Sequence, residues 1–321
     1  MSEIIFPLAG KRVWIAGHRG MVGSAVRRRL ATEQCDVIVA ERRDLDLTRQ
    51  EEVEKWLAAH RLDAIVMAAA KVGGIAANDR YPTEFIYNNL IIEANVIRAA
   101  HRADVNHLLF LGSSCIYPKF AAQPIVEDAL LTGPLEPTNE WYAVAKIAGI
   151  KLCQAYQKQY GRRYISAMPC NLYGPGDNFD LQSAHVLPAL IRKAYEAKLT
   201  NARDITIWGS GKPRREFLHV DDCADGLILL LEKYAGREHV NVGFGEDISI
   251  ADLAALIARI VGFEGGLRMD PTKPDGTPRK LMSSEKASAL GWRPQIGLEE
   301  GIRRAYAWYL EKQSAPSVAT V

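Results

Sequence analysis

The chain lacks the features that would place it in a membrane or in an oxidising compartment. None of its apolar runs approaches the roughly 20 residues that a membrane-spanning helix requires. The five cysteines form no Cys-x-x-Cys pair, so the sequence indicates neither a zinc site nor a disulfide framework. Residues 1–7 have no basic start and contain an early acid, Glu3, so they do not match a signal peptide. We therefore expect a cytoplasmic protein without a membrane partner or a metal ion.

An excess of charge of either sign is also missing. Lysine and arginine number 40 and aspartate and glutamate 38, which leaves a formal net charge of +2. This balance gives no reason to expect nucleic acid as a partner. With 48% hydrophobic and 24% charged residues the composition is that of a globular protein, and 321 residues suffice for one large domain or two smaller ones.

Short apolar runs alternate with helical spacing through the first half of the chain. Strands are expected at residues 12–16, 36–40, 64–68, 107–111 and 164–168, and helices at 21–30, 50–59, 82–103 and from 138 or 139 to 160. Pro82 suits a first helical turn, and Thr138 or Asn139 can cap the last of these helices. Strands that alternate with helices predict an α/β fold with a doubly wound parallel sheet.

The alternation loosens after residue 174. We expect a helix at 185–197, a strand at 205–208, a helix after Asp222 and a helix at 250–261. Residues 1–174 are thus the predicted main domain, and residues 175–312 mainly a smaller mixed α/β domain, some of whose elements return to the first sheet. The small and polar segment 313–321 is predicted to be a disordered tail.

A glycine-rich turn follows the first expected strand and opens the first expected helix. In such a turn the first glycine allows the tight bend, the second lets the backbone approach a pyrophosphate, and the third lets helix and strand pack closely. The free N–H groups at the helix N-terminus then attract phosphate. A plain strand-to-helix turn is the alternative, but the context favours a dinucleotide site in a Rossmann domain. The residues predicted to contact the cofactor are Gly17, His18, Arg19, Gly20, Met21, Val22 and Gly23.

The residues after the second strand give a mixed signal about the dinucleotide. An acid there, such as Glu41, favours the free 2′-hydroxyl of NAD, whereas Arg42 and Arg43 favour the 2′-phosphate of NADP. Arg19 adds a further cation, and two or three guanidiniums can clamp one phosphate. We therefore favour NADP, with a solvated arginine loop as the alternative.

Tyr142 and Lys146 lie one turn apart on an expected helix and therefore share a face. A nearby ammonium favours the phenolate, which eases proton exchange between Tyr142 and a substrate oxygen. Lys146 can also hold the ribose of a nicotinamide. Ser113 follows the fourth strand, at the sheet edge where ligands bind, and can hydrogen-bond the same oxygen. A tyrosine on an exposed helix face is the alternative, which the position after the fourth strand disfavours.

From about Val13 to about Trp308 the chain resembles the extended short-chain dehydrogenase/reductase family. Its sugar-nucleotide epimerases, dehydratases and reductases act on a sugar hydroxyl or ketone with a Ser-Tyr-Lys set, which Ser113, Tyr142 and Lys146 match. Dehydratases of the family carry an Asp-Glu pair after the serine, whereas this chain has Ser114-Cys115, which disfavours dehydration. The resemblance implies that residues 175–312 bind the substrate. It also implies further cofactor contacts at Leu111, Gly112, Ser113, Lys146, Pro169, Asn171, Leu172 and His185.

Longer strings resemble one branch of this family, whose members convert GDP-4-keto-6-deoxy-D-mannose into GDP-L-fucose by epimerising C3 and C5 and reducing C4 with NADPH. The strings are residues 68–75, 112–118, 136–140, 171–175, 215–222 and 273–277. The resemblance implies that Cys115 is the base and His185 the acid of the epimerisation. The implied substrate contacts are Lys193, Trp208, Arg215 and Asp275.

Plainer interpretations stay open at this point. Cys115 alone would more often be a core residue, His185 a helix-terminal residue, Lys193 a solvated side chain and Trp208 a hydrophobic residue of the smaller domain. The alternative activities are an NAD-dependent sugar-nucleotide 4-epimerase, a C4 reductase without epimerisation, an enzyme for another GDP-keto-sugar and a non-enzymatic dinucleotide sensor. The resemblance also implies a homodimer that joins through the two long helices expected from Pro82 and from Thr138.

Overall fold

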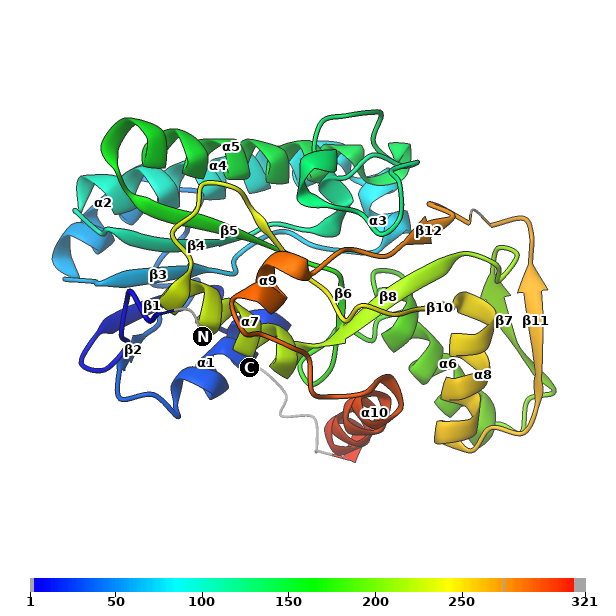
Figure 1. The fold of residues 1–321 in the computed structure, drawn as a ribbon. Helices are drawn as coiled ribbons and strands as arrows, with labels where there is room; N and C mark the ends of the chain where they lie inside the picture. The colour runs from blue at the N-terminus through cyan, green and yellow to red at the C-terminus, as the bar shows by residue number, and fades with distance from the viewer. Residues whose placement is uncertain (1–2, 274, 315–321) are drawn as a thin grey trace.

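A six-stranded sheet, parallel throughout, forms the larger part of the molecule (Figure 1). The computed structural model describes residues 3–273 and 275–314. In spatial order the strands are β2 (Asp36–Ile38), β1 (Arg12–Ala16), β3 (Ala64–Met67), β4 (His107–Leu111), β5 (Arg163–Pro169) and β9 (Val240–Val242). Because the chain leaves β1 toward β2 on one side and returns to β3 on the other, the topological switch point lies at the end of β1.

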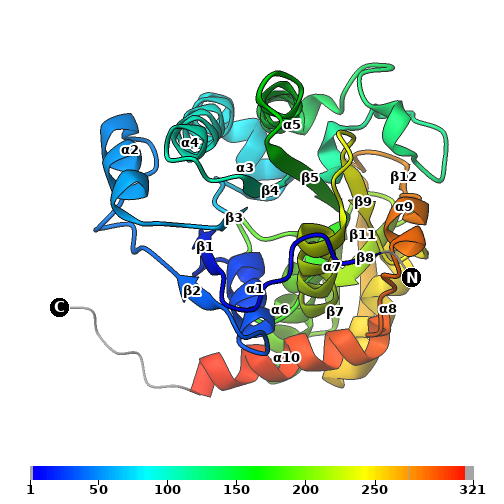
Figure 2. The same cartoon turned by 60° about the vertical axis from the view of Figure 1, so that its left-hand side comes forward.

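Helices cover both faces of this sheet, as Figures 1 and 2 show. One face carries α2 (Gln50–Ala59), α4 (Pro82–Arg102) and α5 (Glu140–Tyr160), and the other carries α1 (Met21–Leu30) and α7 (Val220–Lys233). A short helix, α3 (Ile75–Arg80), precedes α4. Strands buried between two helical layers explain the nearly continuous apolar runs in the sequence. The predicted doubly wound α/β fold is therefore confirmed.

A smaller part lies beyond the carboxyl edge of the sheet (Figure 1). Its strands are β6 (Asn171–Tyr173), β7 (Asp204–Trp208), β8 (Arg214–His219), β10 (Asp247–Ser249), β11 (Gly266–Asp270) and β12 (Arg279–Lys280). β8 is central to one sheet, pairing with β6, β10 and β12, while β7 pairs with β11. The accompanying helices are α6 (Val186–Leu199), α8 (Ile250–Val261), α9 (Glu285–Ala289) and α10 (Leu298–Ser314).

The differences from the expected elements are local. The second strand ends at Ile38 rather than at residue 40, and the helix expected after Asp222 already begins at Val220. The helices α3, α9 and α10 and the strands β6, β8, β9, β10, β11 and β12 were not expected. Gln313 and Ser314, placed in the predicted tail, belong to α10, whereas residues 315–321 lie outside the described residues. The division at residue 174 stays a prediction.

Two expected absences can be compared with the described residues. Within residues 3–273 and 275–314, no helix has the length and apolar character needed to cross a membrane. The five cysteines, all of them in this part of the chain, carry free thiols.

The layer formed by α4 and α5 packs closely on β4 at Gly149. A Cβ on this residue would collide with the ring of Phe110 and lie 2.7 Å from Glu93 Oε2. In an open helix alanine is more stable than glycine by about 1 kcal/mol. Overpacking a core costs about 1–3 kcal/mol, which is the larger effect.

We therefore expect Gly149→Ala to lower the free energy of unfolding by up to about 2 kcal/mol, in spite of the better helix propensity. Urea denaturation with an unchanged slope measures this difference. Ala148→Gly, one residue away in the same helix, isolates the propensity contribution. A higher free energy of unfolding for Gly149→Ala would show that the packing around Gly149 can accommodate a Cβ.

Candidate active site

The glycine turn after β1 is shaped to receive a phosphate. Gly17 has φ +89°, in the left-handed region, and a Cβ there would lie 2.7 Å from the backbone of Ala69. A Cβ on Gly23 would collide with the Gly17 carbonyl. α1 has Gly20 at its N-cap, no side-chain cap and no acid in its first turn. Its first N–H groups are therefore left for an anionic ligand, which fits a dinucleotide pyrophosphate.

The carboxylate of Glu41, which follows β2, contacts two side chains of the glycine turn. Its carboxylate contacts Arg19 Nη2 at 2.8 Å and His18 Nε2 at 3.3 Å. Arg19, Arg42 and Arg43 remain exposed around it. An acid already engaged by two cationic or polar side chains is less available to a ribose hydroxyl, whereas the surrounding guanidiniums fit a 2′-phosphate. The donor set therefore fits NADP better than NAD.

Ser113, Cys115 and Tyr142 come together after β4. Ser113 starts a 3-10 turn, η1 (Ser114–Ile116), and its Oγ accepts the Cys115 N–H at 3.3 Å. Tyr142, in the first turn of α5, hydrogen-bonds Ser113. Burial raises the pKa of Tyr142, the negative charges of Cys115 and Glu93 add to this effect, and the Ser113 hydrogen bond opposes it. The phenol is therefore held in its protonated form.

Lys146 is buried beside a carboxylate that sequence analysis missed. Its side chain is 2% exposed, and Nζ lies 3.0 Å from Oε1 of Glu93, which is also 2% exposed. Burial raises the pKa of Glu93, and the attraction of Lys146 opposes this shift. The expectation that Lys146 favours the Tyr142 phenolate needs correction, because Glu93 balances the ammonium charge. A signal was available, since Glu93 follows the buried Phe85 and Asn89 at a spacing of four on α4.

Asn139 contacts the Cys115 thiol instead of capping α5. The residue ends the 3-10 turn η3 (Pro137–Asn139), and its Nδ2 donates to Cys115 Sγ at 3.5 Å. No side chain caps α5, and Thr138 Oγ1 donates to Glu136 Oε1 at 3.4 Å. The prediction that Thr138 or Asn139 caps this helix was therefore wrong with respect to the side chain.

His185 stands at the N-cap of α6 and is joined by its backbone neighbours to the loop after β3. Gly74 N–H donates to the Ser183 carbonyl at 3.0 Å, and a Cβ on Gly74 would lie 2.6 Å from the Ala184 carbonyl oxygen. Desolvation lowers the pKa of His185 although the side chain is exposed. Tyr142 is likewise partly exposed, and its pKa is also shifted chiefly by desolvation.

Arg215 on β8 belongs to the smaller part of the molecule and interacts electrostatically with Cys115. Burial lowers the pKa of Arg215, and the charges of Cys115, Glu136 and Asp275 act in the opposite direction. These interactions place its guanidinium within electrostatic reach of Cys115.

Asn171, a predicted cofactor contact on β6, is bound to β8. Its Nδ2 donates to the backbone carbonyl of Glu216, the residue after Arg215, at 2.8 Å.

The other predicted substrate contacts surround Trp208, whose side chain is 45% exposed. Lys193 Nζ lies 5.6 Å from the ring centroid and donates to the Thr206 carbonyl at 2.9 Å, so Lys193 is not a solvated helix residue. Lys273, which sequence analysis did not single out, lies 5.4 Å from the same ring. Asp275 accepts the Ser210 N–H at 2.7 Å and the Ser210 hydroxyl at 2.8 Å, and thus supports the turn after β7.

The predicted cofactor contacts outside the glycine turn lie at the carboxyl ends of the neighbouring strands. Leu111 ends β4, and the N–H of Gly112 donates to the Ala167 carbonyl of β5 at 2.9 Å. Pro169 ends β5, and Leu172 lies in β6. Parallel pairing thus brings segments far apart in sequence to one edge of the sheet.

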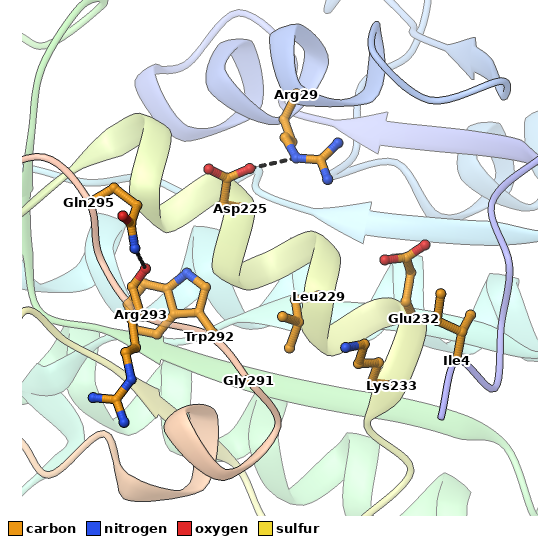
Figure 3. A pocket seen from close by; sticks show the side chains of 10 residues that line it. All are labelled: Ile4, Arg29, Asp225, Leu229, Glu232, Lys233, Gly291, Trp292, Arg293 and Gln295. Carbon is orange, nitrogen blue, oxygen red and sulfur yellow. Dashed lines mark hydrogen bonds and ion pairs between the residues drawn. The ribbon is translucent and has the colours of Figure 1, made fainter. Parts of the chain in front are cut away.

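A separate hollow of about 480 Å³ lies between α7 and the loop at residues 291–295 (Figure 3). An ion pair of 2.5 Å between Arg29 and Asp225 crosses its upper rim, and Trp292 forms part of its wall. None of the predicted site residues lines it. The hollow is therefore not the candidate active site.

Comparison with known proteins agrees with this geometry. Residues 13–243 match the NAD dependent epimerase/dehydratase family. The chain belongs to this family. It is 63% identical over 302 residues to a GDP-L-fucose synthase of Sinorhizobium fredii (strain NBRC 101917 / NGR234), covering 94% of this chain and 96% of that protein. It is 52% identical over 316 residues to the GDP-L-fucose synthase of Escherichia coli (strain K12), covering 95% and 98%.

A solved structure extends the comparison to three dimensions. The GDP-L-fucose synthetase from Naegleria fowleri bound to NADP superposes with a TM-score of 0.88 at 27% identity, covering 98% of this chain and 99% of that one. The Rossmann-like sheet and the smaller mixed sheets are thus those of this epimerase/dehydratase family.

The Glu93–Lys146 pair yields a stability prediction. Glu93→Leu leaves a buried ammonium without a counter-charge, and breaking a buried pair costs about 3–5 kcal/mol. We expect this loss in urea denaturation at neutral pH. The double variant Glu93→Leu/Lys146→Met removes both charges and should recover much of the loss.

Glu300→Gln is the matched control, because Glu300 pairs with Arg304 on the exposed face of α10 and should change stability little. Equal effects of Glu93→Leu and Glu300→Gln would contradict the assignment of Glu93 as the counter-charge of Lys146.

Proposed function

We propose that this member of the family converts GDP-4-keto-6-deoxy-D-mannose into GDP-L-fucose, the reaction of a GDP-L-fucose synthase. It epimerises C3 and C5 of the sugar and reduces C4 with NADPH. The observation that carries this conclusion is the Cys115 thiol, which accepts a hydrogen bond from Asn139 Nδ2 within electrostatic reach of Tyr142, while the Cys115 backbone N–H donates to Ser113 Oγ. The high identity to GDP-L-fucose synthases over nearly the whole chain supports the choice of substrate.

Epimerisation uses the acidity that the 4-ketone gives to the hydrogens on C3 and C5. The Cys115 thiolate takes one of these protons and becomes a thiol, while the electron pair of the C–H bond moves onto O4. Tyr142 and Ser113 donate hydrogen bonds to this enolate oxygen. His185 returns a proton to the opposite face of the carbon, and its lowered pKa makes the imidazolium a stronger acid.

Reduction uses the same oxygen and the same tyrosine. NADPH supplies a hydride to C4 when it is bound. Tyr142 donates its phenolic proton to O4 as the negative charge develops there, and burial keeps this proton on the phenol until then. Beside the tyrosine, the Glu93 carboxylate offsets the positive charge of the Lys146 ammonium. The residues that would hold the cofactor are those of the glycine turn, Arg42, Arg43, Leu111, Gly112, Lys146, Pro169, Asn171, Leu172 and His185.

The nucleotide end of the substrate is assigned to the smaller part of the molecule. Arg215 can pair bidentately with a pyrophosphate oxygen, and Lys193 supplies a second cation. Trp208 offers an exposed ring close to two ammonium groups, those of Lys193 and Lys273, for contact with the nucleotide or the sugar. Asp275 retains acceptor capacity for a hydroxyl beside its contacts with Ser210.

One assay tests the proposed function. The purified protein is mixed with GDP-4-keto-6-deoxy-D-mannose and NADPH, the cofactor absorbance is followed, and the sugar is identified by NMR. We expect NADPH consumption with GDP-L-fucose as the product. GDP-D-rhamnose as the product would instead show a C4 reductase without epimerisation. Absence of consumption would favour the NAD-dependent 4-epimerase.

Tyr142→Phe should remove the proton donor and leave the fold intact. Loss of a general acid typically lowers the rate by about 10²–10⁴-fold, so we expect a drop of this size in NADPH oxidation. NADPH binding, measured by fluorescence titration, should persist, because Tyr142 contributes no charge to the cofactor site. Turnover close to that of the unaltered protein would contradict the assignment of Tyr142.

We also propose that the protein is a homodimer joined through α4 and α5. These helices pack side by side on the outer face of the sheet (Figure 1). They expose Tyr87 at 60%, Trp141 at 41% and Val144 at 41% on that face. Apolar side chains on two adjacent exposed helices support a four-helix interface between two copies.

A charge on each helix should separate the two copies. We expect Tyr87→Arg/Val144→Arg to sediment as a monomer where the unaltered protein sediments as a dimer. Phe120→Arg is the control, because Phe120 is 75% exposed but lies outside both helices. A double variant with unchanged mass would place the interface elsewhere.

A further inference from the structure

The side chain of Asn139 does not do what an asparagine at the start of a helix usually does. Its side chain does not cap α5, although asparagine is among the preferred capping residues. In the described part of the chain its Oδ1 is buried without a hydrogen-bond partner. Native proteins seldom leave a buried amide oxygen unpaired. The amide is therefore held for the contact that it does make, the donation of Nδ2 to Cys115 Sγ at 3.5 Å.

We infer that Asn139 is a positioning residue for Cys115, whose amide N–H orients the sulfur and favours the thiolate that takes the proton from C3 and C5. The inference rests on the proposed function, because it assigns a supporting residue to the base of that reaction. A hydrogen-bond donor favours the charged form of its acceptor. The Cys115 N–H, which donates to Ser113 Oγ, fixes the other side of the residue.

The charged surroundings of the thiol explain why a neutral donor is useful. The titratable and charged groups facing Cys115 are Tyr142 on α5 and Arg215 on β8. Glu136, which also acts on Arg215, is paired with Lys119 at 3.0 Å. A pyrophosphate bound to Arg215 would take up much of the guanidinium charge. The Asn139 amide keeps its effect on the sulfur whether or not the substrate is present.

The experiment separates proton abstraction from reduction. The complete protein is incubated in D₂O with GDP-4-keto-6-deoxy-D-mannose and NADP⁺, and deuterium entry at C3 and C5 is followed by NMR as a function of pH. Reduction at C4 is measured separately with NADPH. The variants are Asn139→Asp and Asn139→Ala. Thr138→Ala is the matched control, because Thr138 lies in the same 3-10 turn but its hydroxyl contacts Glu136.

We expect Asn139→Asp to slow deuterium entry at neutral pH by about 10- to 100-fold, the size of a hydrogen bond to a charged group. A carboxylate at position 139 repels the thiolate, so the thiolate forms only at higher pH and the rise of the exchange rate moves upward in pH. Reduction at C4 should continue and yield the unepimerised sugar. Asn139→Ala should lose about 10-fold in exchange, and Thr138→Ala should behave like the unaltered protein.

Two results overturn the inference alone. The first is that Asn139→Asp exchanges deuterium with the same rate and pH dependence as the unaltered protein. If Asn139→Asp does not fold, the same result with Asn139→Ala overturns the inference. The other is a parallel loss of exchange and reduction without a shift in pH, which would make Asn139 merely structural. An unaltered protein that neither exchanges deuterium nor consumes NADPH overturns the proposed function and the inference together.

Discussion

Parallel pairing of the six strands determines where the chemistry of this molecule takes place. Because β1, β4 and β5 run in the same direction, the glycine turn, Ser113 and Pro169 all emerge at one edge of the sheet. The glycine turn and the acid–base groups Ser113, Cys115 and Tyr142 are therefore neighbours although 90 or more positions separate them in sequence. The smaller part of the molecule lies over this edge, so Arg215 can act on Cys115 from the other side.

The first half of the fold could be predicted because it consists of long helices and buried strands, whose spacing is a local property of the sequence. Ser113, Tyr142 and Lys146 could be predicted because they belong to short motifs placed after recognisable elements. β9 could not, since three residues pair with β5 across a long connection. Glu93 and Asn139 were missed for a related reason. Their significance depends on which side chain they face, and a glutamate on a helix is usually solvated.

The electrostatics of the site are consistent with a tyrosine that gives a proton rather than takes one. Burial raises the pKa of Tyr142, and Glu93 offsets the charge of the neighbouring Lys146. Without this counter-charge the ammonium would favour the phenolate, and the phenol would keep its proton less readily. The counter-charge on α4 thus fits a site in which the same phenol first stabilises an enolate oxygen and then protonates the alcohol oxygen.

The contact between Gly74 and the Ser183–Ala184 backbone has an evolutionary consequence. It holds the segment that carries His185 against the cofactor-binding half, while Cys115 is fixed from the end of β4. With Cys115 as the proposed base and His185 as the proposed acid, the two faces from which a carbon loses and regains its proton depend on the spacing of two loops. On these proposed roles, we expect an insertion of one or two residues before His185 to abolish inversion and to leave Ser113, Tyr142 and Lys146 in place. Loss of epimerisation with retention of reduction would then require a change in this loop alone.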